Sequence, residues 1–392
     1  MARRVFLHIG VPKSGTTFLQ TSMWRNRPAL QAQGFLYPGR ERMDHYHASR
    51  EVRGVSPARM GEYAGVWDRL VERLGAWEGD GLISHEFLSM ASPKQARAAV
   101  RALAPARVHI VVTARDYLRQ LPAVWQEDLK MHSQESFDEF VERMLGPDSA
   151  GPGYPLRGAW GWRSQDVPAV LRRWGGGVRP SRVHVITVPR PGAPRGVLWE
   201  RWAQVLGIDD RDFDLTAAVP NESLGAPQAA LLQRVKPRLT PPLGDGVAQH
   251  RWVRQYFAHE VLVPQRGERV VVRDSHVAAV RERSLQAVES LRRARYAVCG
   301  DLAELVPDSG APNGGHPEDV APEELLDVAA RAIDQMIHDV RALTLERNEW
   351  RAQAERRRPV LGRAAGKVAS AVRRRVQPGS AVVRDTEQGA EG

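Results

Sequence analysis

The feature that most constrains the fold of this chain stands near its start, where an apolar strand runs into a glycine-bounded loop and then a helix. The run Val5–Ile9 is typical of a buried strand, and Gly10-Val11-Pro12-Lys13-Ser14-Gly15-Thr16-Thr17 follows it directly. Glycine lets backbone N–H groups converge, and a helix N-terminus offers unpaired donors whose dipole favours negative charge. Lys13 adds a positive charge, and Thr16 and Thr17 add hydroxyl donors. The pattern predicts an anion site; the alternative is a plain glycine turn before a capped helix.

The loop differs from the Walker A sequence GxxxxGK[ST], which holds the phosphates of magnesium-bound nucleoside triphosphates. Its lysine precedes the second glycine by two residues, and Thr16 stands where the Walker lysine would be. The later strand that could supply a metal-binding aspartate ends instead in Thr113-Ala114-Arg115. A nucleotide-dependent phosphotransferase is therefore disfavoured, although it stays open as an alternative, as does a non-catalytic nucleotide-binding protein.

Short β-branched runs alternate with helical patterns through the first half of the chain. Such alternation predicts an α/β protein, with a central parallel sheet flanked by helices in three P-loop-like layers. The expected strands are 5–9, 82–84, 108–113 and 183–188. The expected helices are 17–25, 61–77, 93–103, 118–130, 137–145, 168–174 and 195–206. Strand signals thin out after residue 215, where helices are expected at 226–236, 250–261 and 275–295.

The C-terminal part has a different composition. We expect the α/β domain to cover 1–306, a Gly/Pro/Asp-rich linker 307–317, a long helix 318–357 and a basic, disordered tail 358–392. Apolar or small residues recur at heptad spacing on the helix: Leu326, Ala329, Ile333, Met336, Val340, Leu343 and, after Arg347, Trp350. This spacing predicts a coiled-coil seam and a homodimer, or else a helix packed on its own domain.

Composition excludes several classes of protein. The 392 residues, with a net charge of +10, suffice for about two domains or one large one with appendages. The lone Cys299 excludes a disulfide-stapled secreted protein, and no apolar run of membrane-spanning length or signal peptide is evident, so a cytoplasmic protein is expected. No nucleic-acid-binding motif accompanies the basic charge. A weak membrane-surface contact could come from the tail residues Arg363, Lys367 and Arg373–Arg375.

The loop resembles a known family. Pro12-Lys13-Ser14-Gly15-Thr16-Thr17 is similar to the P-K-[ST]-G-T-T loop of sulfotransferases, bacterial ones included, that use 3′-phosphoadenosine 5′-phosphosulfate (PAPS). The resemblance covers residues 1–210, with an extension toward 306. It implies that Pro12, Lys13, Ser14, Gly15, Thr16 and Thr17 bind the 5′-phosphosulfate of PAPS as co-substrate, without a metal.

The family also has an arginine at a strand end that binds the 3′-phosphate, with a serine about eight residues later. Arg115 follows the strand 108–113 and matches this arginine, but Ala123 stands in the place of the serine. Arg119, one turn after Arg115, could supply a second cation on the same helix face. The alternatives are ordinary ion pairs, such as Arg115 with Asp116 or Arg119 with a nearby carboxylate.

The general base of such a transferase is a histidine or a glutamate at another strand end. In Ser84-His85-Glu86-Phe87 we favour Glu86 over His85, and expect burial to raise the pKa of Glu86. If the strand continues, only one of the two faces the site; alternatively, Glu86 caps the next helix or pairs with an arginine. The acceptor is expected to be a hydroxyl of a carbohydrate, a glycolipid or a small metabolite. Its candidate contacts are Trp125, Gln126, Glu127, Lys130, Tyr154, Arg157, Trp160, Trp162 and Arg163, although the tryptophans could equally be core.

Overall fold

The computed structural model describes residues 2–131, 133–146, 161–194, 196–211, 213–216, 223–243, 245–308, 310 and 313–375, the last nineteen by their backbone. The chain divides into two units, residues 1–330 and 331–392. The first unit holds a six-stranded parallel sheet in the order β2-β3-β1-β4-β5-β6. The strands are β1 (Arg4–His8), β2 (Phe35–Leu36), β3 (Asp80–Ser84), β4 (Arg107–Ala114), β5 (Val183–Thr187) and β6 (Ala297–Cys299).

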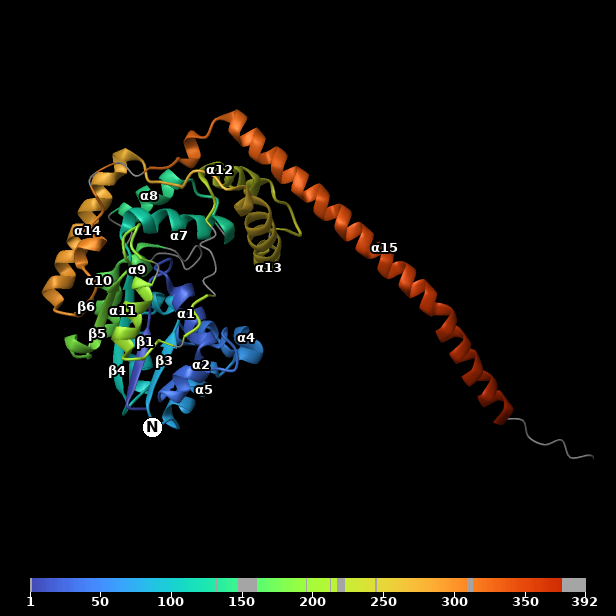
Figure 1. Cartoon of the computed structure of the whole chain (residues 1–392), viewed down its shortest axis with the longest axis horizontal. Helices are drawn as coiled ribbons and strands as arrows, with labels where there is room; N and C mark the ends of the chain where they lie inside the picture. Colours follow the sequence, from blue (N-terminus) through green and yellow to red (C-terminus); the bar gives the residue numbers. More distant parts are fainter. Residues whose placement is uncertain are drawn as a thin grey trace, which may run out of the picture. The chain divides into compact units, whose positions relative to one another are not determined.

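Helices cover both faces of the sheet, which confirms the predicted three-layer α/β fold (Figure 1). Alternate residues of β1 point to opposite faces, so that Phe6 joins one hydrophobic cluster while Val5 and Leu7 join the other. The Phe6 cluster includes residues of α1 (Thr16–Arg25), α2 (Arg27–Ala32) and α11 (Val197–Leu206). The opposite cluster includes residues of α5 (Val66–Gly75), α6 (Pro93–Ala102), α10 (Val167–Gly175) and α14 (Asp274–Ala294).

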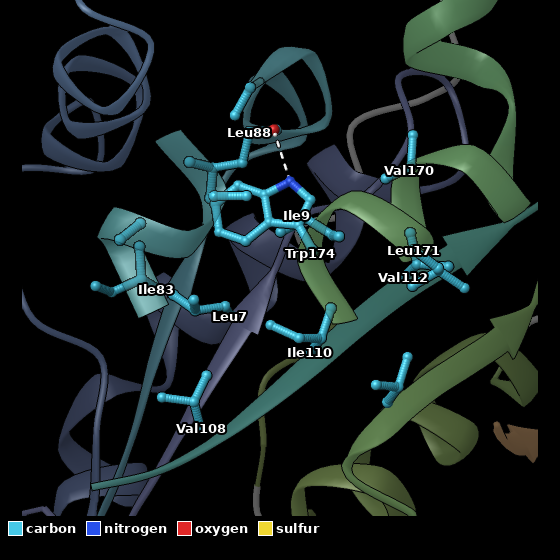
Figure 2. Close-up of a cluster of buried hydrophobic side chains, with 14 of the residues drawn as sticks. Leu7, Ile9, Ile83, Leu88, Val108, Ile110, Val112, Val170, Leu171 and Trp174 are labelled. Carbon is cyan, nitrogen blue, oxygen red and sulfur yellow. Dashed lines mark hydrogen bonds between the residues drawn. The ribbon is translucent and has the colours of Figure 1, made fainter. Parts of the chain in front are cut away.

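Trp174 is one of the two buried tryptophans of the second cluster, and Figure 2 shows it among aliphatic residues of β1, β3 and β4. Its ring is 1% exposed, and its Nε1–H donates to the Leu88 carbonyl oxygen at 3.1 Å. The hydrogen bond satisfies the one polar atom of a side chain that otherwise buries apolar surface. The cluster therefore fixes α10 and the segment after β3 against the same face of the sheet.

The predicted strands and most of the predicted helices are present, but the structure differs from the expectations in two respects. Two strands were missed, because β2 has two residues and β6 three, too few for an apolar pattern to show. Strand β6 lies in the region after residue 215, where strand signals thin out in the sequence. The helix expected at 250–261 is a π-helix, Gln249–Leu262, labelled η6.

The remaining helices surround this framework. They are α3 (Asp44–Val52), α4 (Pro57–Met60), α7 (Tyr117–Met131), α8 (Phe137–Leu145), α9 (Trp162–Gln165), α12 (Ala226–Val235), α13 (Gly246–Ala248) and α15 (Pro322–Arg375). Short 3₁₀ helices connect them, among them η1 (Gly61–Tyr63), η2 (Glu86–Met90), η4 (Pro180–Arg182), η5 (Lys236–Arg238), η7 (Val263–Gln265), η8 (Leu302–Leu305) and η9 (Pro317–Asp319). Helix α15 continues to Arg375, so residues 358–375, which were expected to belong to a disordered tail, are helical, and residues 376–392 lie outside the described residues. None of the described helices is long and apolar enough to cross a membrane.

Candidate functional site: an anion-binding loop at the end of the sheet

Three neighbouring strands bring the predicted site residues to one edge of the sheet. Strand β1 lies between β3 and β4, and His8 at its end is in register with Ser84 of β3 and Val111 of β4. All three strands are parallel, so the segments that follow them leave from the same side. Those segments carry the loop 10–15, Glu86 and Arg115. Ligands of open α/β sheets bind at this carboxyl edge.

The loop has the backbone geometry of a tight cradle. Gly10 and Gly15 have positive φ angles of 41° and 88°. A Cβ placed on Gly10 would lie 2.8 Å from the Thr16 side chain and 3.3 Å from the Cα of Glu86, so only glycine fits there. Helix α1 begins at Thr16 after Gly15, with no side-chain cap and no acidic residue in its first turn. The backbone N–H groups at the start of α1 are therefore available to bind an anion.

A buried network of hydrogen bonds connects the loop to the ends of β1, β3 and β4. The Ser14 hydroxyl donates to the Val11 carbonyl at 2.6 Å and lies 2.6 Å from the Thr113 hydroxyl. His8 bonds Ser84 through Nδ1 at 2.8 Å and approaches Thr113 through Nε2 at 3.4 Å. The side chain of Ser14 therefore serves the loop itself, whereas Thr17 is exposed and Thr16 is buried at the helix start. Burial lowers the pKa of His8 to about 3, so it is neutral.

Lys13 belongs to an ion-pair group that links three parts of the chain. Its ammonium lies 2.8 Å from Oε2 of Glu127 on α7, and Nε of Arg254 on η6 lies 2.8 Å from Oε1 of the same carboxylate. Burial opposes the ionised form of Glu127, but Lys13, Arg254 and Lys130 outweigh it and hold the pKa of Glu127 far below its ordinary value. The group therefore carries one net positive charge at the loop. Sequence reasoning placed Glu127 with the acceptor and missed Arg254, because no motif marks either.

Arg115 holds the other side of the loop. One guanidinium nitrogen donates to the Lys13 carbonyl at 3.4 Å, while its buried Nε has no hydrogen-bond partner. Among the residues that the structure describes, no carboxylate forms an ion pair with Arg115, because Asp116 pairs with Arg119 instead. The expected alternative of an Arg115–Asp116 pair is therefore wrong. Burial, followed by the charge of Arg119, lowers the pKa of Arg115 to about 10, which leaves it charged at neutral pH.

Arg119 makes more hydrogen bonds within the protein than Arg115 does. It bonds Asp116 and donates to the Pro189 carbonyl at 3.0 Å, the ordinary ion pair considered in the sequence analysis. Ala123 lies half-buried on α7 and offers no hydroxyl. A neighbour on that helix, Gln120, donates instead to the Pro12 carbonyl at 3.0 Å, so α7 holds the loop backbone as well as carrying Glu127.

Glu86 and His85 differ from the expected arrangement in two respects. Strand β3 ends at Ser84 and Glu86 begins the 3₁₀ helix η2, so the rule of alternating faces does not apply, and His85 Nδ1 lies 4.0 Å from Glu86 Oε2. Burial pushes the pKa of Glu86 up, but His85, a backbone donor and Gln20 together lower it below its ordinary value. The expected rise was wrong, since burial was weighed without these partners. Glu86 is ionised at neutral pH.

The surroundings of the two residues also differ. Glu86 packs on Gly10 and accepts a hydrogen bond from Gln20 of α1 at 3.0 Å, so it borders the loop. It caps no helix, because α6 is capped by Ser92. The Nδ1 atom of His85 accepts the Phe87 N–H at 3.1 Å, and its ring lies beside Tyr46 at 5.4 Å between centroids. Burial lowers the pKa of His85.

The tryptophans proposed as acceptor contacts are core residues where they are described. Trp125 is fully buried against Phe137, and Trp162 is 2% exposed against Tyr117. Gln126 accepts the Leu224 N–H. These residues therefore stabilise the fold, as the alternative interpretation held. Tyr154, Arg157 and Trp160 lie outside the described residues.

A second charged cluster is explained by ion pairing. Asp138, His316 and Glu318 are near enough together to hold a metal ion. Arg273 already neutralises Asp138 at 2.7 Å and bonds Asp319, and Glu318 lies 2.8 Å from His316. A cation there would compete with the guanidinium, so the cluster is a structural connection between α8 and η9.

No family model matches the sequence, and no curated protein matches it. Among solved structures, the chain is similar to a sulfotransferase from Alicyclobacillus acidocaldarius, with 18% sequence identity and a TM-score of 0.38. The match covers 56% of this chain and 88% of that one. At this level of similarity, function has to be inferred from the residues of this chain.

Proposed function

We propose that this protein is a PAPS-dependent sulfotransferase that transfers a sulfuryl group to a hydroxyl of a carbohydrate, a glycolipid or a small metabolite. The observation that carries the proposal is Arg115, a largely buried guanidinium that contacts the anion-binding loop and forms no ion pair with any carboxylate among the described residues. A buried charge without a partner is costly, and a phosphate that pairs bidentately with arginine removes that cost. PAPS has a phosphosulfate for the loop and a second phosphate for Arg115.

The transfer needs little beyond positioning and charge stabilisation. An acceptor hydroxyl oxygen forms a bond to sulfur while the bond from sulfur to the bridging phosphate oxygen breaks, and the departing nucleotide keeps the electron pair. Negative charge grows on that oxygen, so the α1 N-terminus and the Lys13 ammonium are suited to stabilise it. The backbone N–H groups at the start of α1 and the Lys13 side chain thus supply the positive charge that the transfer needs.

The acceptor must also lose a proton, and Glu86 is suited to take it. Its carboxylate is ionised and borders the loop at Gly10. The Nδ1 of His85 is already an acceptor for a backbone N–H, and its ring lies among aromatic side chains. The roles proposed are therefore general base for Glu86 and support of that carboxylate for His85.

The test is isothermal titration calorimetry with adenosine 3′,5′-bisphosphate, the nucleotide product of PAPS. Wild-type protein should bind it, and Arg115→Ala should weaken binding by roughly 10- to 100-fold, since hydrogen bonds to charged groups contribute about 1.5–3 kcal/mol. The matched control is Arg107→Ala, because Arg107 is exposed at the opposite end of the same strand. Its affinity should equal that of the wild type.

Two outcomes would contradict the proposal. Tight binding of magnesium-ATP without binding of the bisphosphate would favour a phosphotransferase. Bisphosphate binding without sulfate transfer from radiolabelled PAPS, across a panel of sugar, glycolipid and small hydroxyl acceptors, would favour a non-catalytic nucleotide-binding protein. Transfer that is lost in Lys13→Ala supports the enzyme.

A further inference from the structure

Helix α15 carries exposed apolar side chains that the proposed function does not use. Leu326, Ile333, Met336, Val340, Leu343 and Trp350 are between 38% and 71% exposed. We call these six residues the apolar stripe. Their spacing alternates between three and four residues from Ile333 to Leu343 and is seven residues at either end, where Ala329 and Arg347 occupy the intervening positions, so they follow one narrow line along the helix. Large exposed apolar patches of this kind mark interaction surfaces.

The pattern within the apolar stripe indicates what covers it. In heptad notation Leu326, Ile333 and Val340 occupy a positions, and Met336, Leu343 and Trp350 occupy d positions. β-Branched residues at a with leucine at d favour two parallel strands, and Ile333, Val340 and Leu343 meet that rule. Arg347 occupies the next a position, where a single polar residue fixes register and strand number. A second helix with the same sequence is therefore the occupant that fits.

The charged residues beside the apolar stripe select the orientation. The g positions hold Asp339 and Glu346, and the following e positions hold Thr344 and Arg351. In a parallel pair each g position faces the next e position of the other helix, so Glu346 meets Arg351. In an antiparallel pair centred on this region the g positions face each other, and acidic side chains would repel. Charge complementarity thus favours the parallel pair.

We propose that a second copy of this chain covers the apolar stripe, as a parallel, in-register, two-stranded coiled coil. The inference is independent of the proposed enzymatic function, because it rests on α15 alone. The protein would then be a homodimer whose two chains are held together by residues 326–350.

The first test is the mass of the full-length protein by sedimentation equilibrium. The wild type should have twice the chain mass of 43.7 kDa, and Val340→Asp should shift to the chain mass at the same concentration. The matched control is Leu345→Asp. Leu345 is also exposed, at 47%, but it lies at an f position away from the apolar stripe, so this variant should stay dimeric. Unchanged melting of the α/β unit in both variants would show that it remains folded.

The second test distinguishes parallel from antiparallel pairing. In a Cys299→Ser background, Met336→Cys and Trp350→Cys each place one thiol at a d position. In a parallel, in-register pair each variant should form its own disulfide dimer under mild oxidation, since equivalent d positions meet. A dimer of unchanged mass in which neither variant forms its own disulfide would overturn the parallel arrangement, since an antiparallel pair places a positions opposite d positions. A monomeric wild type, or dissociation by Leu345→Asp as strong as by Val340→Asp, would overturn the coiled coil altogether.

Discussion

The buried carboxylate of Glu127 holds both Lys13 and Arg254, and its charge therefore controls how strongly the loop attracts an anion. An incoming phosphate must compete with Glu127 for Lys13. Glu127→Gln should tighten binding of adenosine 3′,5′-bisphosphate several-fold, up to about tenfold, because removal of one negative charge near the loop raises the local potential. Calorimetry at low and moderate salt measures this change, and the gain should shrink with added salt.

Glu142→Gln removes the same charge from an exposed position on α8 and provides the control. Its affinity should match that of the wild type. Weaker binding in Glu127→Gln would show instead that Glu127 positions Lys13 for the ligand and that the two do not compete.

The hydrogen bond from Gln20 to Glu86 sets the pH range of the proposed base. Glu86 accepts a proton only when ionised, and Gln20 is one of the groups that lower its pKa. Gln20→Ala should raise that pKa, so the acid limb of kcat/KM should move to higher pH, whereas Gln31→Ala on the exposed face of α2 should leave it in place. Glu86→Gln should abolish most turnover. Full turnover in Glu86→Gln would remove Glu86 from the mechanism.

At the scale of elements, His8 connects the ends of β1, β3 and β4 through Ser84 and Thr113. Its folded pKa of about 3 is below the ordinary 6.5, so between these values the unfolded chain binds the extra proton. This contribution to stability is complete above pH 6.5 and is lost as pH falls toward 3. The free energy of unfolding should decline by about 1.4 kcal/mol per pH unit from this group.

Urea unfolding at a series of pH values between 7.5 and 5 measures the decline. His8→Asn should reduce the pH dependence of the free energy of unfolding by the contribution of one proton. It should also lower stability at neutral pH, because the hydrogen bonds of His8 to Ser84 and Thr113 are lost. His338→Asn is the control, since His338 is 70% exposed by its side chain and should leave the slope unchanged. An equal slope in wild type and His8→Asn would contradict the assignment.

The main elements could be predicted because their signals are local. The loop after β1 and the starts of α6 and α8 depend on glycine, proline and capping residues within a few positions. Strands β2 and β6 could not be predicted, because two or three residues gain their strand geometry only from the neighbours they pair with. The π-helix Gln249–Leu262 could be predicted only as a helix, because its apolar residues have a spacing that resembles that of an α-helix.

The site was predictable where a single segment carries it. Lys13, Glu86 and Arg115 follow from strand ends, and the parallel sheet brings those ends together. Glu127 and Arg254 were not predictable as partners of Lys13, because they lie 114 residues and farther along the chain. The pKa of Glu86 likewise depends on a long-range contact, the hydrogen bond from Gln20 of α1, so its direction could not be read from the segment around Glu86.

For the whole molecule, the two units have separate roles in the proposals. The unit of residues 1–330 contains the sheet and the loop, and the seam proposed for the dimer lies mostly on residues 331 onward. Variants of the apolar stripe should therefore change the mass of the particle while leaving nucleotide affinity within error of the wild type. The calorimetric and sedimentation experiments can be interpreted independently for this reason.

The order of the strands also determines when the site exists during synthesis. The loop leaves the ribosome before its flanking strands β3 and β4 and its partners Glu127 and Arg254, which follow it along the chain. Pairings between distant segments form slowly, since the intervening chain must be closed first. A nascent chain that stops before Arg254 thus contains the whole loop sequence but lacks the Arg254 charge that pairs with Glu127 beside the loop. A segment that is made before all of its partners therefore becomes competent to bind only after the last of them has been made.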